Sequence, residues 1–541
     1  MAPHVLCDID CDSTSKPTPD AGDEIVDKAM TLPPISNSQA LAGPSFIGHS
    51  ANTAPLSPKF QFEPQTSGMH QDGGNSGSTD YPGPMGHNIS VFSALIPLRT
   101  FFWDRHGHMT AGFTDASGNA TSPIYGLAAV DQRTLEIEAT WLPPSKGQVL
   151  NFAYTELVQE DNSILVTSKQ GQIYVVQRSC ADEQPTFNLT RTINLTVEAV
   201  LQQGETLLNA MYDAEGNIWF TSGGIRAQGA GLPGDPAQAS TTVGYIEPDG
   251  TVHNLQITNQ MIENGIAVSG TTMYAVTGPS GSNDHANATG YMYSFKPGPR
   301  DQVTTAWRVP YSAGNARKPG AFARGSGSTP TLLGNQFVAI TDNANSQINL
   351  ITYRQDAAPD QTVCSVPLFQ PGASNNDVGA VAHLDGDKYG LALFNNYNGP
   401  SLYPGKGDLN GAFNNMSVIT AATVRVDVAA DGTECKLAWD TPIRIKSVAL
   451  QSTATGLLYG YTQSERLARE GLYEWYVTAL DWRSGDVVWQ VRAGAGGSFN
   501  DDYLPGTLGP DGTFYQAVLE GVVQVKDGST GPRWQNHSSE Q

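Results

Sequence analysis

From about residue 88 onward, the chain consists of short runs of alternating apolar and polar residues separated by turn signals. One unit recurs: an apolar run, a turn, a strand with aromatic residues, then a further turn and strand. LLNAMYDAEGNIWFTSGG followed by VGYIEPDGTVHNLQI is a clear copy, and WYVTALDWRSGDVVWQVRAG belongs to another. About eight copies follow one another at a spacing of roughly 50 to 60 residues, the range for propeller blades with loop insertions.

A single blade cannot bury both of its faces, so several blades must stack radially around an axis. The last copy, YLPGTLGPDGTFYQAVL with GVVQVKDG, is one strand short. The run at residues 88–99 can supply that strand and close the ring, which removes exposed sheet edges. We therefore predict an all-β chain that forms a single propeller with eight blades; seven blades are the alternative. Two separate β domains are disfavoured, because no linker interrupts the repeats.

Residues 1–87 lack periodic apolar pattern and are rich in Pro, Gly, Ser and Asp. Such a segment cannot bury enough apolar surface to offset its ordering entropy. We predict an irregular N-terminal arm, partly packed on a propeller body at residues 88–533, and a short tail at 534–541. The end of the arm, at residues 69–86, carries His, Asp and Asn among glycines, so it can be tucked against the body.

The charge balance, 30 Lys+Arg against 52 Asp+Glu, gives a net charge of −22. This argues against nucleic acid as a partner, because a phosphate-binding surface needs clustered Lys and Arg. No run of about 18 apolar residues predicts a membrane span. The first residues lack the basic and apolar regions of a signal peptide. Seven Asn-x-Ser/Thr sequons nevertheless favour a secreted glycoprotein, and a cytoplasmic location is the alternative.

Five cysteines are present, so at least one thiol stays unpaired within the chain. Cys364 and Cys435 fall on the late strands of adjacent repeats, and we predict a disulfide between them. Cys7 and Cys11 lie in the arm and could pair there. A zinc site at these two residues is disfavoured, because no second Cys/His pair follows nearby.

Several segments resemble known families. ALDWRSGDVVWQV resembles the strand–turn–strand of pyrroloquinoline-quinone-type propeller repeats, and DAEGNIWFTSGG resembles blades of gluconolactonase and strictosidine-synthase-like propellers. Over nearly the whole body, motifs such as MHQDGGNS, FNNYNGP and NDDYLPGTLGPDGT resemble a group of secreted propellers from bacteria and fungi without settled chemistry. That group tends to carry an acid where this chain has Asn375-Asn376 and Phe394-Asn395-Asn396. The resemblance implies the architecture and leaves the reaction open.

Propeller sites form at the top of the central channel, where the inner strands and the loops leading into them converge. Polar residues at the start of each repeat are therefore the candidates, and we predict that Glu156 is catalytic. The predicted substrate-binding residues from these positions are Asn209, Asn264, Ser328, Asn376, Lys446, Asn500 and Asp502. A ring of this kind suits hydrogen bonding to a polar small molecule. The alternative is that these groups bind neighbouring loops and channel waters.

His70 and Asp72 lie in the Gly-rich end of the arm. A His that titrates near neutrality and an Asp that orients it are the minimum for acid/base work, so we predict that both are catalytic. Arg317 lies in a cationic loop and is predicted to bind an anionic group of a substrate. The alternatives are an ordinary polar linker and a solvated loop. His106 and His108 could chelate a metal, but Asp104 to Gly107 has the pattern of a hairpin turn.

These observations favour a cofactor-free enzyme that acts on a small polar organic molecule in the channel. The reaction class would be that of a lyase, isomerase or cyclase, or of a lactone-type hydrolase. One alternative is an oxidoreductase that depends on calcium or another metal, or on pyrroloquinoline quinone. The other is a non-catalytic extracellular binding propeller. The sequence indicates neither the substrate nor the oligomeric state.

Overall fold

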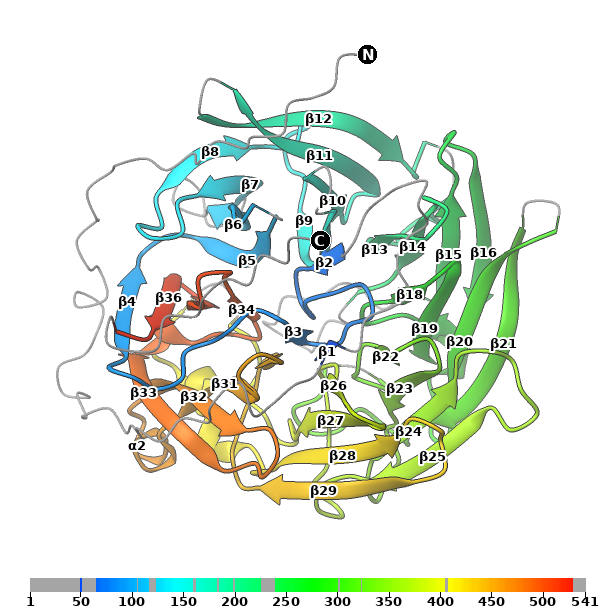
Figure 1. Ribbon diagram of the computed structural model, residues 1–541. Helices are drawn as coiled ribbons and strands as arrows, with labels where there is room; N and C mark the ends of the chain where they lie inside the picture. The colour runs from blue at the N-terminus through cyan, green and yellow to red at the C-terminus, as the bar shows by residue number, and fades with distance from the viewer. Residues whose placement is uncertain are drawn as a thin grey trace.

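The described strands form eight sheets arranged as the blades of one propeller, and all their strand pairs are antiparallel except that of β3 with β30 (Figure 1). The structure is a computed structural model that describes residues 49–50 and 65–528, except 105, 116–122, 159–161, 182–183, 198–199, 225–238, 300–301, 323 and 404–406. The prediction of eight blades is confirmed, and the seven-blade alternative is wrong. The predicted tail at 534–541 and most of the arm lie outside the described residues.

Blades 1 to 4 follow one another along the chain, each with its inner strand first. Blade 1 consists of β5 (Leu98–Trp103), β6 (Met109–Asp115), β7 (Ile124–Val130) and β8 (Ile137–Trp141). Blade 2 consists of β9 (Leu150–Val158), β10 (Ser163–Ser168), β11 (Gln172–Ala181) and β12 (Gln184–Asn194). Blade 3 consists of β13 (Leu207–Tyr212), β14 (Ile218–Ser222), β15 (Ser240–Ile246) and β16 (Val252–Thr258). Blade 4 consists of β17 (Gln260–Met261), β18 (Ala267–Ser269), β19 (Thr272–Pro279), β20 (Thr289–Gly298) and β21 (Gln302–Ser312).

Blades 5 to 8 complete the ring. Blade 5 consists of β22 (Thr331–Leu333), β23 (Phe337–Thr341), β24 (Asn349–Arg354) and β25 (Thr362–Pro367). Blade 6 consists of β26 (Val381–Asp385), β27 (Lys388–Phe394), β28 (Thr423–Ala429) and β29 (Cys435–Thr441). Blade 7 consists of β30 (Leu450–Ser452), β31 (Leu457–Gln463), β32 (Glu474–Asp481) and β33 (Val487–Ala495). Blade 8 consists of β34 (Gly506–Leu508), β35 (Phe514–Val518), β36 (Gly521–Lys526) and β4 (Ser90–Ala94).

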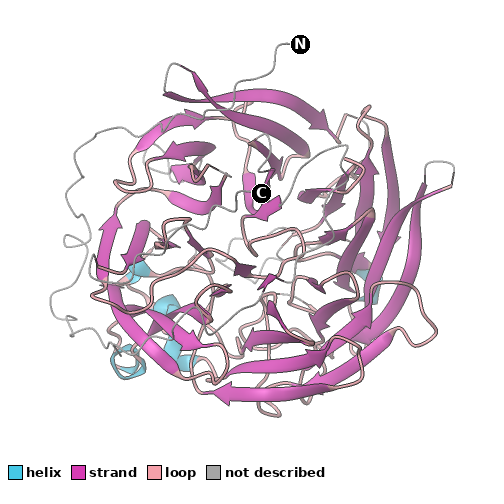
Figure 2. Ribbon diagram, in the orientation of Figure 1, coloured by secondary structure: helices cyan, strands magenta, loops and turns pink. Residues whose placement is uncertain are grey.

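The helical segments lie in the connections between strands (Figure 2). In the part of the chain that the structure describes, they are α2 (Glu465–Arg469) and the short 3-10 turns η3 (Gly281–Asn283), η4 (Ala412–Asn414), η5 (Met416–Val418) and η6 (Gly497–Phe499). Within the described ranges, no helix is both long and apolar enough to cross a membrane.

The ring closes as the sequence predicts. Strand β4 pairs antiparallel with β36, from Val522 opposite Ala94 to Lys526 opposite Ser90. The closed seam is packed by aromatic rings from both sides, since Trp103 of blade 1 lies 5.3 Å from Tyr515 of blade 8 between ring centroids. Both side chains are buried. The pairing covers the edge of β36, and the packing buries the facing surfaces of blades 1 and 8.

Burial differs between inner and outer strands for a physical reason. Every residue of β10 is buried, because the strand lies between two neighbouring blades. Outer strands such as β16 alternate between exposed and half-buried residues, because one of their faces meets solvent. The predicted disulfide between Cys364 of β25 and Cys435 of β29 is confirmed, and it joins the outer strands of blades 5 and 6. Cys180 is also disulfide-bonded; Cys7 and Cys11 lie outside the described residues.

The described end of the arm lies in the central channel, against the inner strands of the blades. Strand β2 (Gln65–Ser67) pairs with β9, β3 (Ser78–Thr79) pairs with β30, and β1 (His49–Ser50) pairs with β26. Residues 68–77 cross the channel between β2 and β3 (Figure 1). Their backbone groups bond to the inner parts of five blades, through Thr155, Val268, Leu332, Ala382 and Gln451.

A tight turn in the arm makes this crossing possible. The Asp72 carboxylate accepts hydrogen bonds from the backbone N–H groups of Gly74 (2.9 Å) and Ser76 (3.1 Å) and from the Ser76 hydroxyl. Asn75 adopts a left-handed backbone conformation with φ of 57°. Its side-chain amide then donates to the carbonyl groups of Ile266 (2.8 Å) and Pro330 (3.0 Å) in blades 4 and 5. Asp and Asn suit these positions, because both bond local backbone and Asn tolerates left-handed φ.

We expect Asn75→Ala to lower the free energy of unfolding by about 2 to 4 kcal/mol, because it leaves two buried carbonyl groups without a donor. Chemical denaturation monitored by tryptophan fluorescence measures the change. Asn398→Ala is the matched control. Asn398 has a similar φ of 66°, but it is exposed and bonds one carbonyl at the surface. Equal losses for the two variants would show that the arm does not brace the channel.

Candidate functional site

A cavity of about 210 Å³ lies at the end of the channel where the inner strands begin. The residues just before β18, β22, β26, β30 and β34 line it, together with two residues of the arm. Two long connections also reach it, through Phe322 between β21 and β22 and Leu402 between β27 and β28. Its polar side chains are His70, Glu263, Asn264, Thr329, Asp377 and Asp502, together with the hydroxyl-bearing rings of Tyr154 and Tyr503. This is the position at which the sequence predicts a site.

His70 forms part of the cavity wall from the arm side. Its side chain is nearly fully buried and packs against Gly379, where a Cβ would come within 3.0 Å of the imidazole carbon Cε1. Gly379 therefore makes room for the ring. Burial lowers the pKa of His70 to about 4, so the imidazole is neutral at pH 7 and offers one N–H donor and one nitrogen acceptor. The imidazole makes no hydrogen bond to any residue that the structure describes.

Asp502 and Tyr503 reach the cavity from the loop before β34. Both have positive φ, 42° and 66°, which is strained for residues other than glycine. The surrounding contacts hold this conformation: the Asn500 side chain accepts a hydrogen bond from the Asp502 N–H (2.8 Å), and the Tyr403 N–H donates to the Asp502 carboxylate (3.1 Å). The Asn500 side chain is itself fixed by Asn414 (2.8 Å). Strain held in this way is typical of functional positions.

Lys446 lies directly behind Asp502 and is fully buried. Its Nζ is 3.7 Å from Asp502 Oδ1 and 4.7 Å from the centroid of the Tyr503 ring. The carboxyl group of Asp501 also interacts with the buried ammonium group of Lys446. Burial raises the pKa of Asp501 to about 7, and Lys446 partly opposes that rise. Burial also raises the pKa of Asp502, again opposed by Lys446. The carboxyl groups of Asp501 and Asp502 thus share the one ammonium group of Lys446 as their nearby positive charge.

The other two acids are fixed by hydrogen bonds. Glu263 accepts one from the backbone N–H of Arg324 (2.8 Å), and Asp377 accepts one from the Asn375 amide (2.8 Å) and one from the Phe322 N–H (3.3 Å). The Arg324 side chain turns away from the cavity and bonds the Asp284 carboxylate (3.2 Å).

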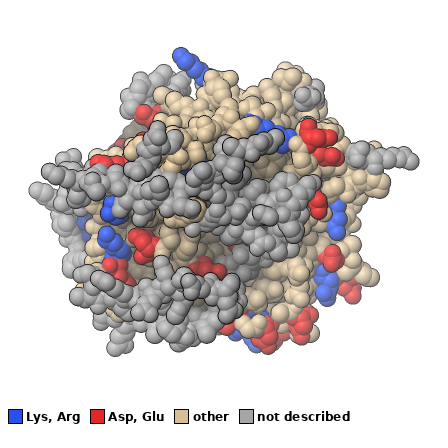
Figure 3. Space-filling model, turned by 45° about the horizontal axis from the view of Figure 1, so that its top comes forward, with Lys and Arg blue, Asp and Glu red and all other residues tan. Residues whose placement is uncertain are grey.

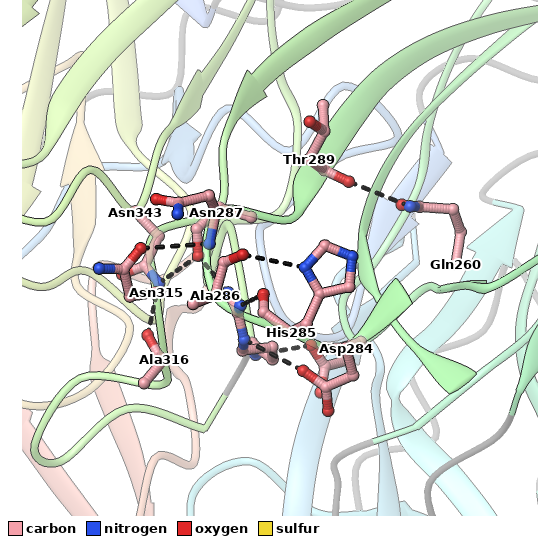
Figure 4. Close-up of polar contacts among 12 residues, drawn as sticks. Gln260, Asp284, His285, Ala286, Asn287, Thr289, Asn315, Ala316 and Asn343 are labelled. Carbon is pink, nitrogen blue, oxygen red and sulfur yellow. Dashed lines mark hydrogen bonds and ion pairs between the residues drawn. The ribbon is translucent and has the colours of Figure 1, made fainter. Parts of the chain in front are cut away.

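The loops of blades 4 and 5 around Arg324 brace one another. Arg324 also donates to the His285 carbonyl (2.9 Å). Figure 4 shows the loop that carries Asn287 against the loop that carries Asn315 and Ala316. The Asn287 N–H donates to the Asn315 side chain (3.2 Å). These loops therefore form a fixed wall behind Glu263.

The structure brings together His70, Asn264 and Asp502 at the cavity, with Lys446 behind them. Asn500 does not line the cavity but positions Asp502. Arg317 is half-buried and lies outside the lining. Asp72 does not bond the His70 ring, because its carboxylate is used by the backbone turn. Its pKa is raised to about 6 by burial, against the hydrogen bonds from Ser76 and Gly74.

The remaining predicted residues are not among the residues that line the cavity, and Asn209, Ser328 and Asn376 make internal hydrogen bonds. Glu156 is buried on β9, and burial raises its pKa well above the ordinary value. The Asn209 amide donates to Thr221 (2.8 Å) and to the Asn264 carbonyl (3.1 Å). Ser328 accepts from the Thr341 N–H (2.8 Å), and Asn376 donates to the Phe394 carbonyl (3.0 Å). These hydrogen bonds agree with the alternative interpretation of the sequence, in which such polar groups hold neighbouring loops in place.

Some lining residues were not predicted. Glu263 and Tyr503 each stand next to a predicted residue, so the same positional argument extended by one residue includes them. Phe322 and Leu402 carry no comparable signal, because long irregular connections bring them to the cavity. The predicted hairpin turn at Asp104 to Gly107 is present, with the Asp104 carboxylate accepting from the His108 ring (2.9 Å). Within the described part of the chain, no three His, Cys, Asp or Glu side chains gather as a metal site.

Comparisons with known proteins describe the architecture only. No family model matches the chain. An uncharacterised protein of Archaeoglobus fulgidus is 26% identical over 242 residues, which cover 40% of this chain and 45% of that protein. This chain thus spans less than half the length of that relative.

Solved structures with a similar arrangement include two enzymes. The quinohemoprotein alcohol dehydrogenase ADHIIG from Pseudomonas putida HK5 has a TM-score of 0.49 at 9% identity, over 90% of this chain and 84% of its own. An oligogalacturonate lyase in complex with manganese has a TM-score of 0.40 at 10% identity, over 83% of this chain and 96% of its own. The first belongs to the quinoprotein class that the repeats resemble, but at these values neither likeness carries an argument about function.

We expect Asp501→Asn to change the pH dependence of stability. The folded pKa of about 7 lies above the ordinary 3.8, so between about pH 4 and 7 the unfolded chain ionises while the folded chain keeps the proton. The native protein therefore loses stability as pH rises through this window. The variant lacks this loss and gains roughly 2 to 4 kcal/mol relative to the native protein between pH 4 and pH 8. Denaturation at a series of pH values tests this against exposed Asp486→Asn, which should follow the native curve.

Proposed function

We propose that the cavity binds a small polar organic molecule and catalyses a proton transfer on it without a cofactor, as in a lyase, isomerase, cyclase or lactone-type hydrolase. The observation that carries the proposal is His70. It is a buried, neutral imidazole without a hydrogen-bond partner among the described residues, and it lines the same cavity as a carboxylate of raised pKa.

The proposed chemistry follows from the surroundings of Asp502 and of His70. A desolvated carboxylate such as Asp502 is a stronger base than one in water, because burial disfavours its charged form. When Asp502 takes a proton from a carbon or hydroxyl group of the ligand, its carboxyl group becomes neutral. The positive charge of Lys446 is then no longer offset by Asp502. Negative charge that moves onto the ligand is then stabilised by the same ammonium.

His70 meets the ligand from the arm side of the cavity. A neutral imidazole donates a hydrogen bond to a carbonyl oxygen as negative charge develops there. The strained backbone at Asp502 and Tyr503 keeps the base in place before the ligand arrives, which lowers the cost of reaching the reactive geometry. Base, donor and counter-charge all come from the chain itself, and this supports a cofactor-free reaction.

We also propose that the protein works outside the cell. The disulfide between Cys364 and Cys435 supports an oxidising compartment, because such bonds are rare in reducing cytosol.

A library of small polar metabolites incubated with the full chain tests the proposal, with consumption of each compound measured by mass spectrometry. For any compound consumed, we expect His70→Asn to lower the rate by about 100-fold or more, since a positioned acid/base group contributes that much. The melting temperature should change little, because backbone bonds hold the arm. His106→Asn, in the exposed hairpin, is the matched control. A rate that His70→Asn leaves unchanged would contradict the proposal.

A further inference from the structure

The cavity is locally negative. Glu263, Asp377 and Asp502 line it, and no Lys or Arg is among its described lining residues. The buried ammonium of Lys446 offsets one of these charges from behind. In the view of Figure 3, both basic and acidic side chains lie on the described surface. The cavity thus shares the acidic excess of the chain, whose net charge is −22.

Aromatic rings complete the lining. Tyr154, Phe322 and Tyr503 all contribute to it. Phe322 meets Tyr503 edge to face, with 4.6 Å between ring centroids. A carboxylate beside an aromatic ring is the environment that binds organic cations in proteins. The chain shows this chemistry in its own structure, because Lys446 Nζ lies both near the Asp502 carboxylate and over the Tyr503 ring.

His70 points independently to a ligand. Its imidazole is 3% exposed and lines the cavity, yet no described residue bonds it. Because the ring lines the cavity, a ligand there can supply the hydrogen-bond partner that the described residues do not supply. The neutral ring has a nitrogen that accepts a hydrogen bond from an N–H group. A ligand with N–H donors satisfies it, and a carboxylate or phosphate would instead face three acids.

We infer that the ligand of this cavity carries an organic ammonium group, held between the Asp502 and Asp377 carboxylates, the aromatic rings and the His70 nitrogen. This inference rests on the proposed function, since it names the substrate class of the same site. It replaces the anionic group that the sequence predicts for Arg317, which lies outside the cavity.

Three probes of one shape and different charge test the inference on the full chain at pH 7: 2-phenylethylamine as the cation, 2-phenylethanol as the neutral isostere and phenylacetate as the anion. Isothermal titration calorimetry measures their affinities. We expect 2-phenylethylamine to bind at least about tenfold more tightly than 2-phenylethanol, with no measurable binding of phenylacetate. Raising the salt concentration should weaken the amine more than the alcohol.

Charge-neutralising variants locate the binding. Asp502→Asn should weaken 2-phenylethylamine by about tenfold and leave 2-phenylethanol nearly unchanged. If that variant does not fold, Asp377→Asn should give the same selective loss. The exposed Asp431→Asn, in the turn between β28 and β29, is the matched control and should bind the amine like the native protein.

The outcomes separate this inference from the proposed function. Equal or tighter binding of the alcohol or of phenylacetate, lost in His70→Asn, would overturn the ammonium inference and leave the small-molecule site standing. Binding of none of the probes would also overturn it, and the metabolite library would then decide the proposed function on its own. Amine binding that survives both Asp502→Asn and Asp377→Asn would place the cation elsewhere and overturn the assignment.

Discussion

Hydrogen bonds between the backbone of arm residues 68–77 and the inner strands are the interaction on which both the ring and the site depend. The innermost strand of each blade has an edge that faces the channel, and its N–H and C=O groups need partners there. The arm supplies partners to five blades at once. In doing so it carries His70 to the middle of the ring. The wall of the cavity and the brace of the propeller are thus the same piece of chain.

Burial has opposite effects on stability and on chemistry at this site. It destabilises the ionised forms of Asp501 and Asp502, which lowers the stability of the fold at neutral pH. The same desolvation makes the carboxylates stronger bases and keeps His70 neutral. The positive φ values at Asp502 and Tyr503 add strain in the same place. Buried carboxyl groups and positive φ values both destabilise the fold, and both occur where we expect a function. The well-packed blades around the site supply the stability that allows these features to persist.

The sequence predicts the parts of the fold that depend on local periodicity. Alternating runs identify the blades, the missing strand in the last repeat identifies β4, and the late strands of neighbouring repeats identify the pair Cys364 and Cys435. The course of the arm has no such signal. Its bonds run through the backbone of a Gly-rich segment, and a side-chain pattern does not reveal backbone partners.

The same limit applies to the site. Position at the start of a repeat correctly brings Asn264 and Asp502 to the cavity. It does not tell which neighbouring polar groups turn inward, so Asn209, Ser328 and Asn376 were predicted in the lining and instead bond internal groups. Phe322 and Leu402 reach the cavity through connections whose paths depend on tertiary packing. A residue such as Asn500 acts through Asp502, and no sequence pattern indicates a role of that kind.

The arm and the closing strand have a consequence for how the molecule is assembled. β4 follows the arm directly, and its partner β36 is the last strand among the described residues. The ring therefore stays open until the final blade has formed. Gln71 in the arm likewise bonds Gly506, which is 435 residues away in the chain. Contacts between such distant residues form late in folding. Closing the long loop between them costs conformational entropy before the contact itself contributes stability. Completion of the cavity therefore coincides with completion of the propeller, and an intermediate that lacks the last blade does not yet have the finished site.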